Sequence, residues 1–245
     1  MRLWLYALGM CQSMFCALPF PWHGWEEKAR DRMLLCLPLI GLEIGFLWWG
    51  LSWLSTFCHI PQTIRAVVLT GAPYLLTGFM HLDGFMDVTD AVRSYRSLER
   101  RREILKDSHV GSFAVIGVIL VILGQFSACF SLEPGMDARA LILIPVVSRC
   151  CSVLAIQLLK PMSTSQYARR QPHVVTPLLM LLLALALGFW MGINVGLPLL
   201  GCILGFSMAL YRGYRSLQGM NGDISGYCLT IGELTALITL AIFYG

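Results

Sequence analysis

Seven apolar stretches follow one another along the chain, each close to the length that crosses a lipid bilayer. A helix needs about 20 apolar residues to cross a hydrocarbon core of roughly 30 Å. No stretch shows the two-residue alternation of transmembrane β-strands, so we expect helices, whose backbone groups are hydrogen-bonded within the segment. The stretches are residues 33–57, 64–80, 110–132, 140–159, 174–191, 196–210 and 224–244. They predict an all-α, polytopic integral membrane protein, a bundle of about six to seven transmembrane helices.

The composition agrees with a membrane protein. Of the 245 residues, 57% are hydrophobic and 13% are charged, whereas a soluble domain carries about 25% charged residues. No linker or low-complexity tract divides the chain, which predicts a single membrane-embedded domain over residues 1–245, multi-pass in a cell membrane and surrounded by lipid. The nine cysteines lie mostly inside apolar stretches, where they are typical small hydrophobic residues. An oligomer is compatible with such a chain.

The first 20 residues are also apolar, but they end beside Pro19 and Pro21 and carry one charge, Arg2. No small-residue cleavage pattern precedes the prolines. We therefore expect an embedded or re-entrant helix here rather than a cleaved signal peptide.

Lysine and arginine are concentrated in alternate connections between the apolar stretches. Four connections hold most of them: residues 21–32, 81–109, 160–173 and 211–222. The opposite connections hold little beyond Arg65 and Arg139. Because cytoplasmic loops collect these residues, the four connections are predicted to lie in the cytoplasm. The net charge of +4 comes from these loops rather than from a basic arm, which argues against a nucleic-acid partner.

The stretch HLDGFMDVTD, residues 81–90, places three aspartates on this face. On a helix, Asp83, Asp87 and Asp90 would lie within an arc of roughly 60°. Carboxylates crowded on one face repel one another, and a bound cation removes the repulsion. Mg²⁺ prefers oxygen ligands and is usually held by a few carboxylates together with substrate phosphates. We therefore predict a Mg²⁺ site at these aspartates; the alternative is a solvated helix face.

Basic residues follow the acidic stretch. Arginine binds phosphate in a bidentate manner and lysine binds it as a point charge, so this segment could hold a diphosphate. A solvated helix with local ion pairs is the alternative. Lys106 and Asp107 are the strongest candidates because they lie where the segment meets the next membrane stretch at Gly111. His81 is either an interfacial histidine or a part of the site. The basic residues are Arg93, Arg96, Arg100, Arg101, Arg102 and Lys106.

A second polar segment, GMNGDISG at residues 219–226, is predicted to share this face. Gly219, Gly222 and Gly226 permit the close backbone approach that holds an anion at a helix start. Asp223 is a candidate helix N-cap, metal ligand or both.

Three ionisable residues fall within the apolar stretches: Glu43, Arg149 and Glu233. Charges in lipid are costly, so we expect these side chains to face the interior of the bundle. Arg149 is the strongest candidate for a phosphate or carboxylate partner.

Three segments resemble the motifs of one family: GFMHLDGFMDVTDAV, REILKDSHVGSFAV and GMNGDISGYCLTIGEL. They are similar, in the same order, to the cobalamin synthase family, the adenosylcobinamide-GDP ribazoletransferases, and the similarity covers nearly the whole chain. The family motifs fall on His81, Leu82, Asp83, Gly84, Asp87, Asp90, Lys106, Asp107, Ser108, Gly111, Phe113, Gly219, Gly222, Asp223 and Gly226. The departures are Cys16, Ala91, Ala114, Gln218 and Asn221. None of them is an acidic position of the family.

The resemblance implies a Mg²⁺-dependent transferase of a bacterial or archaeal cytoplasmic membrane. A ribose hydroxyl of α-ribazole, or of its 5′-phosphate, would attack the cobinamide-bearing phosphorus of adenosylcobinamide-GDP, and GMP would leave. By this resemblance Asp83 and Asp87 hold Mg²⁺, and Asp90 is a further ligand or the base. Asp107 and Asp223 complete the metal shell or position the nucleophile. The predicted substrate contacts are Lys106, Arg149, Gly222 and His81.

Two other functions are compatible with clustered aspartates in a membrane bundle. A CDP-alcohol phosphotransferase also releases a nucleoside monophosphate, but its motif has the glycine after the second aspartate, and here the glycine follows the first. A cation transporter would use the carboxylates as an ion path. Such transporters usually show internal repeats and acidic residues at span centres, which are not evident in this sequence.

Overall fold

The computed structural model describes all residues except 1, 23, 164–172 and 245. The described residues form helices and contain one isolated β-bridge, between Pro161 and Met220, but no strand. The α-helices are α1 (Arg2–Phe15), α2 (Arg30–Met33), α3 (Leu37–Phe57), α4 (Gln62–Leu76), α5 (Met80–Arg93), α6 (Leu98–Ile104), α7 (Ser112–Ser131), α8 (Ala140–Leu158), α9 (Val175–Met191), α10 (Ile193–Leu217) and α11 (Gly222–Tyr244). Two short 3₁₀ turns, η1 (Glu27–Ala29) and η2 (Leu34–Cys36), lead into α3.

The predicted polytopic helical bundle is confirmed. Five helical segments in the described chain are long and apolar enough to cross a membrane, and the number rises to six if the bent pair α4 and α5 counts as one span. Helix α9 is apolar but has only 17 residues. Helix α8 is the most enclosed span, with 67% of its apolar window buried, whereas α7 has 28% buried. Most of the surface of α7 is therefore available to lipid.

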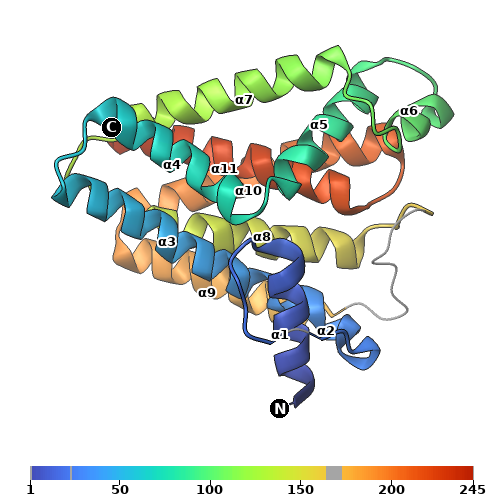
Figure 1. Ribbon diagram of the computed structural model, residues 1–245, viewed down its shortest axis with the longest axis horizontal. Helices are drawn as coiled ribbons and strands as arrows, with labels where there is room; N and C mark the ends of the chain where they lie inside the picture. The colour runs from blue at the N-terminus through green and yellow to red at the C-terminus, as the bar shows by residue number, and fades with distance from the viewer. Residues whose placement is uncertain (1, 23, 164–172, 245) are drawn as a thin grey trace.

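The long helices lie side by side and run back and forth between the two ends of the bundle (Figure 1). The connections α5–α6, α6–α7 and α10–α11 lie at one end, on the right of the figure, together with the C-terminus of α8. These are the connections that the charge distribution assigns to the cytoplasm. Arg169 and Arg170, which belong to the same predicted set, lie outside the described residues.

The predicted span 64–80 differs from the structure because the chain bends by 88° between α4 and α5. Pro73 removes one backbone donor within α4, and Gly78 (φ 59°) and Phe79 (φ 62°) take the left-handed conformation that ends a helix. Phe79 is unusual, because residues other than glycine rarely adopt this backbone conformation. The bend directs α5 across the cytoplasmic end, where it packs on α11.

Helix α1 is too short to cross a bilayer. Its 14 residues span about 21 Å at 1.5 Å per residue, against a core of roughly 30 Å. Ala7, Met10 and Cys11 are buried against the segment around η2 and α3. Beyond the helix, the amide of Ala17 donates to the carbonyl of Leu76 (2.8 Å). The position agrees with the predicted embedded helix and places α1 beside the α4–α5 bend.

Candidate active site

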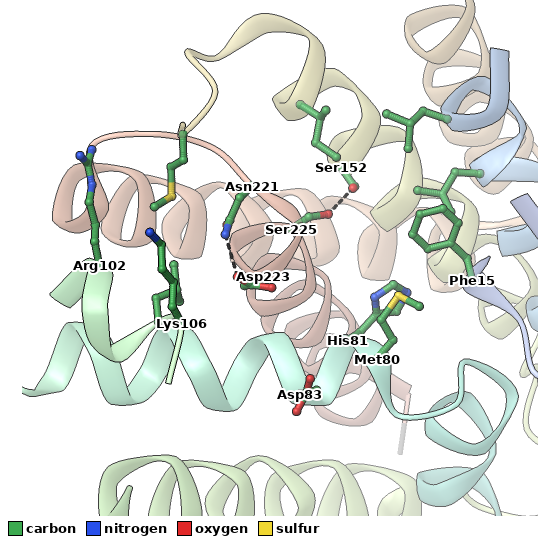
Figure 2. Close-up of a pocket in the computed structure, with 16 residues that line it drawn as sticks. Phe15, Met80, His81, Asp83, Arg102, Lys106, Ser152, Asn221, Asp223 and Ser225 are labelled. Atoms are coloured by element: carbon green, nitrogen blue, oxygen red, sulfur yellow. Dashed lines mark hydrogen bonds between the residues drawn. The ribbon is translucent and has the colours of Figure 1, made fainter. Parts of the chain in front are cut away.

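A cavity of about 300 Å³ lies at the end of the bundle that the charge distribution assigns to the cytoplasm, between α5, α8, α11 and the end of α1 (Figure 2). The predicted site residues that line it are His81, Asp83, Lys106, Gly222 and Asp223. The acidic segment of α5, the basic segment after α6 and the glycine-rich segment before α11 therefore meet in one place. We call this space the cytoplasmic cavity.

Two glycines bring α5 and α11 together at this cavity. A Cβ atom on Gly84 would lie 2.9 Å from the carbonyl oxygen of Asp223, and one on Gly226 would lie 3.0 Å from that of His81. Only glycine allows the two backbones to approach so closely. The hydroxyl of Thr230 also donates to the carbonyl of His81 (3.2 Å). This packing places Asp83 and Asp223 at one cavity although they are 140 residues apart in sequence.

Asn221 caps α11, so the cap role predicted as one possibility for Asp223 is not formed. The side-chain oxygen of Asn221 accepts from the amide of Ile224 (3.1 Å), the usual N-cap contact. Its amide nitrogen donates to Oδ2 of Asp223 (2.7 Å). Asp223 is therefore not the cap, and its carboxylate is oriented by Asn221 at the cavity wall.

The bridge between Pro161 and Met220 holds the segment before α11 in place. The amide of Met162 donates to the carbonyl of Met220 (2.9 Å), and the amide of Met220 donates to that of Lys160 (2.8 Å). Gln218, in the left-handed conformation (φ 52°), ends α10 just before. The segment that carries the cap of α11 is thus held by the bridge to residues 160–162 and by the end of α10.

The three aspartates of α5 have different surroundings. Asp83 lines the cavity, and Asp87 is partly buried and interacts electrostatically with Asp83, Asp223 and Asp90. Asp90 instead accepts a hydrogen bond from the amide of Ala114 (3.1 Å), in the first turn of α7. In the described part of the chain, no three histidine, cysteine or acidic side chains lie together as a complete metal-binding group. The predicted roles of the aspartates in binding Mg²⁺ stay predictions.

Two of the three arginines of α6 bind the end of α10, whereas Arg100 forms an exposed ion pair with Glu103 (2.6 Å). Arg101 donates to the carbonyl of Ser216 (3.3 Å), and Arg102 donates to those of Leu217 (3.0 Å) and Gln218 (2.9 Å). These carbonyls belong to a helix C-terminus, which favours cations. Arg102 and Lys106 still line the cavity.

Asp107 lies apart from the cavity lining, on the exposed loop before α7. Its carboxylate accepts from the backbone amide (3.0 Å) and contacts the ring Nδ1 (2.6 Å) of His109. The hydrogen bond from the His109 side chain lowers the pKa of Asp107. Its predicted catalytic role would require movement of this loop, and it stays a prediction.

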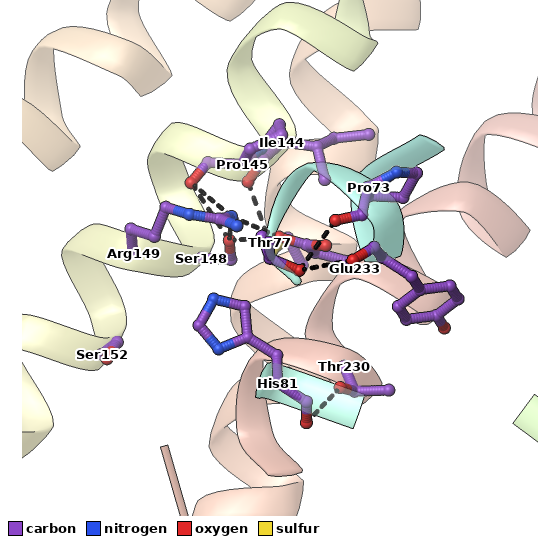
Figure 3. Close-up of polar contacts among 12 residues, drawn as sticks. Pro73, Thr77, His81, Ile144, Pro145, Ser148, Arg149, Ser152, Thr230 and Glu233 are labelled. Atoms are coloured by element: carbon purple, nitrogen blue, oxygen red, sulfur yellow. Dashed lines mark hydrogen bonds and ion pairs between the residues drawn. The ribbon is translucent and has the colours of Figure 1, made fainter. Parts of the chain in front are cut away.

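Arg149 forms a buried ion pair with Glu233 behind the cavity (Figure 3). Nη1 of Arg149 lies 2.6 Å from Oε1 of Glu233, and Ser148 donates to the same oxygen (2.8 Å). Arg149 does not line the cavity, so the predicted phosphate contact is not formed in this arrangement. Nε and Nη2 of Arg149 and Nε2 of His81 are buried without a hydrogen-bond partner.

Some residues that line the cavity could not be identified as site residues from the sequence. Ser152 and Ser225 place their hydroxyls 2.5 Å apart at the cavity wall, and Phe15 reaches it from α1. Serines and phenylalanines inside apolar stretches resemble any other core residue. Asn221 was visible only as a departure from the family pattern.

A polytopic bundle that gathers carboxylates and basic side chains in one cavity is the arrangement expected of a membrane-embedded transferase. A sequence profile described as Cobalamin-5-phosphate synthase matches residues 7–241. The chain belongs to this family.

Relatives of known name support the assignment. An adenosylcobinamide-GDP ribazoletransferase of Clostridium perfringens (strain SM101 / Type A) is 36% identical over 250 residues, covering 99% of this chain and 100% of that protein. Proteins of the same name from Thermosynechococcus vestitus and Pseudomonas putida are 31% and 33% identical, over 98% and 92% of this chain and 97% and 94% of their own lengths. No solved structure shows a significant match.

Proposed function

We propose that this protein transfers the adenosylcobinamide phosphate group of adenosylcobinamide-GDP to α-ribazole or α-ribazole 5′-phosphate. The products are adenosylcobalamin, or its 5′-phosphate, and GMP, so the reaction completes the nucleotide loop of cobalamin. The observation that carries the proposal is the meeting of Asp83, Asp223 and Lys106 in one cytoplasmic cavity. The names of relatives that match nearly the whole chain support the same reaction.

The bond changes follow from the substrates. A ribose hydroxyl oxygen of the acceptor forms a bond to the phosphorus that carries the cobinamide, and the bond from this phosphorus to the oxygen of GMP breaks. GMP leaves with the electron pair of that bond, and the hydroxyl proton passes to a carboxylate. Asp223 is the candidate acceptor of this proton because it lines the cavity and Asn221 orients it.

The donor atoms at the cavity fit Mg²⁺. Asp83 at the cavity and Asp87, about one turn further along α5, offer carboxylate oxygens, and Mg²⁺ in phosphoryl-transfer sites is usually held by one or two carboxylates with substrate phosphates and water. The absence of a complete three-residue group among the described side chains is compatible with a site that the diphosphate completes. When bound, the ion would neutralise charge on the diphosphate.

Lys106 and Arg102 supply the remaining positive charge. Both line the cavity, and Arg102 is held at its edge by the carbonyls of Leu217 and Gln218. A phosphate that enters between them and the carboxylates would be oriented before transfer, and such positioning accounts for much of catalysis in phosphoryl transfer.

The proposal is tested with the purified full-length protein in detergent or lipid nanodiscs. Adenosylcobinamide-GDP, α-ribazole and Mg²⁺ are added together, and GMP and the corrinoid product are quantified by liquid chromatography. We expect equal amounts of both products, and none when α-ribazole is omitted. Release of GMP without a corrinoid product that contains ribazole would contradict the proposed transfer.

A further inference from the structure

We infer that the cytoplasmic cavity is the pocket of the nucleoside acceptor, with the benzimidazole base of ribazole at its apolar end, and that the corrin ring stays outside. This inference rests on the proposed function, which it extends by dividing the site between the two substrates. Three observations carry it: the order of side chains along the cavity, its size, and an unpartnered buried nitrogen at one end.

The side chains change in character along the cavity. In Figure 2 Arg102 and Lys106 lie at one end and Phe15 and His81 at the other, with Asp223 between them. This order matches an acceptor bound lengthwise. Its base would contact the apolar end, and its ribose would lie beside the carboxylates in the middle of the cavity. The diphosphate of the donor would lie at the basic end, next to the ribose.

The apolar end is built from the first part of the chain. Phe15 ends α1, Leu34 lies in η2 and Leu37 begins α3, and all three are buried. They line the cavity together with Met80 and Ile156. A flat base with methyl groups gains free energy by leaving water for such a surface, whereas a phosphate or a nucleotide base rich in polar groups would lose hydrogen bonds there.

The size of the cavity excludes the corrin ring. A volume of about 300 Å³ is at the lower limit of ligand pockets, roughly 300–1,000 Å³, and suits a single nucleoside. The corrin macrocycle with its amide side chains is several times larger than a benzimidazole. It must therefore remain beyond the mouth of the cavity while its phosphate reaches in.

His81 gives the apolar end one polar contact. Its side chain is 8% exposed and lines the cavity, and its Nε2 has no hydrogen-bond partner in the protein. A neutral imidazole donates through one ring nitrogen, and the benzimidazole of ribazole has one unsubstituted ring nitrogen that accepts. Nε2 is covered by protein atoms, so the His81 ring must turn toward the ligand to form this bond, which would satisfy a buried group that is otherwise unpaired.

The first test compares Phe15→Leu with Phe206→Leu. Phe206 is also buried but belongs to the packed core and does not line the cavity. We expect Phe15→Leu to raise the KM for α-ribazole about fivefold or more, through loss of the aromatic contact. The KM for adenosylcobinamide-GDP should stay within about twofold, and Phe206→Leu should change neither constant selectively.

The second test needs no variant. Free 5,6-dimethylbenzimidazole is added to the wild-type enzyme as an inhibitor while each substrate is varied in turn. We expect competition with α-ribazole and not with adenosylcobinamide-GDP. Competition with the donor, or a Phe15→Leu variant that affects only the donor KM, would overturn the inference while transfer itself persists. Absence of GMP release from the wild type would instead refute the proposed function.

Discussion

Arg149 and Glu233 form an ion pair between α8 and α11, with side chains 1% and 9% exposed and 2.6 Å between Nη1 and Oε1. The pair links two central helices directly behind the cytoplasmic cavity, next to Ser148 and His81 (Figure 3). A buried charge is tolerated when it is paired and hydrogen-bonded, and removal of one partner leaves the other uncompensated.

The buried pair should therefore respond unequally to single and double substitution. We expect Glu233→Ala to destabilise the protein by about 3–5 kcal/mol, because the charge of Arg149 would lose its partner. The double variant Arg149→Met/Glu233→Leu should recover most of this loss. Thermal unfolding in detergent measures both effects. A double variant that unfolds at as low a temperature as Glu233→Ala would refute this account of the pair.

Asp90 and Gly111 should be coupled at the start of α7. A Cβ atom on Gly111 would collide with the Asp90 carboxylate, although the backbone of Gly111 (φ −87°) suits any residue. We expect Gly111→Ala to cost about 1–3 kcal/mol. Asp90→Ser provides space and keeps a capping oxygen, so the Gly111→Ala/Asp90→Ser variant should unfold at a higher temperature than Gly111→Ala alone. Independent, additive effects of the two substitutions would argue against the contact.

Asn221 should matter for both stability and turnover. Asn221→Ala removes the cap of α11 and the hydrogen bond to Asp223, at a cost of about 1 kcal/mol from the cap. Asn221→Thr keeps a capping oxygen but lacks the amide donor. We expect Asn221→Thr to restore the unfolding temperature but not the full rate of GMP release. Full recovery of both would mean that Asn221 serves only as a cap.

The loop at the opposite end of the bundle gives a prediction on pH. The hydrogen bond from Arg139 lowers the pKa of Asp137. A carboxyl whose pKa is lower in the folded protein stabilises it above its ordinary pKa, about 4, and this stabilisation is lost as the pH falls through the folded value. Wild type and Asp137→Asn should therefore differ by up to about 1 kcal/mol at pH 6 and converge once the pH has fallen below the lowered pKa of Asp137. A difference that grows on acidification would contradict this sign.

The sequence predicts the helices well because lipid imposes one rule, an apolar run of nearly fixed length, on every span. It does not predict where helices continue outside the membrane. Helix α10 runs to Leu217, beyond its apolar part, and Arg101 and Arg102 donate to the carbonyls at its end. Such contacts join residues more than a hundred positions apart, which periodicity cannot detect.

The same limit applies to the site. The spacing of Asp83, Asp87 and Asp90 indicates one helix face, but the bend at Gly78 and the position of α7 decide which carboxylate meets the cavity. The sequence correctly indicates that Arg149 faces the interior of the bundle. That Glu233 is its partner is known only from the packing of α8 on α11.

The central claim is that the carboxylates of the cytoplasmic cavity carry the transfer. The most direct test compares GMP release, dependent on α-ribazole and Mg²⁺, by wild type, Asp83→Asn, Asp223→Asn and the control Asp137→Asn, whose carboxyl lies at the opposite end of the bundle. We predict that both cavity variants remain folded in detergent and lose about 10²-fold or more of the rate, whereas Asp137→Asn retains it. Near wild-type release by Asp83→Asn and Asp223→Asn would contradict the claim.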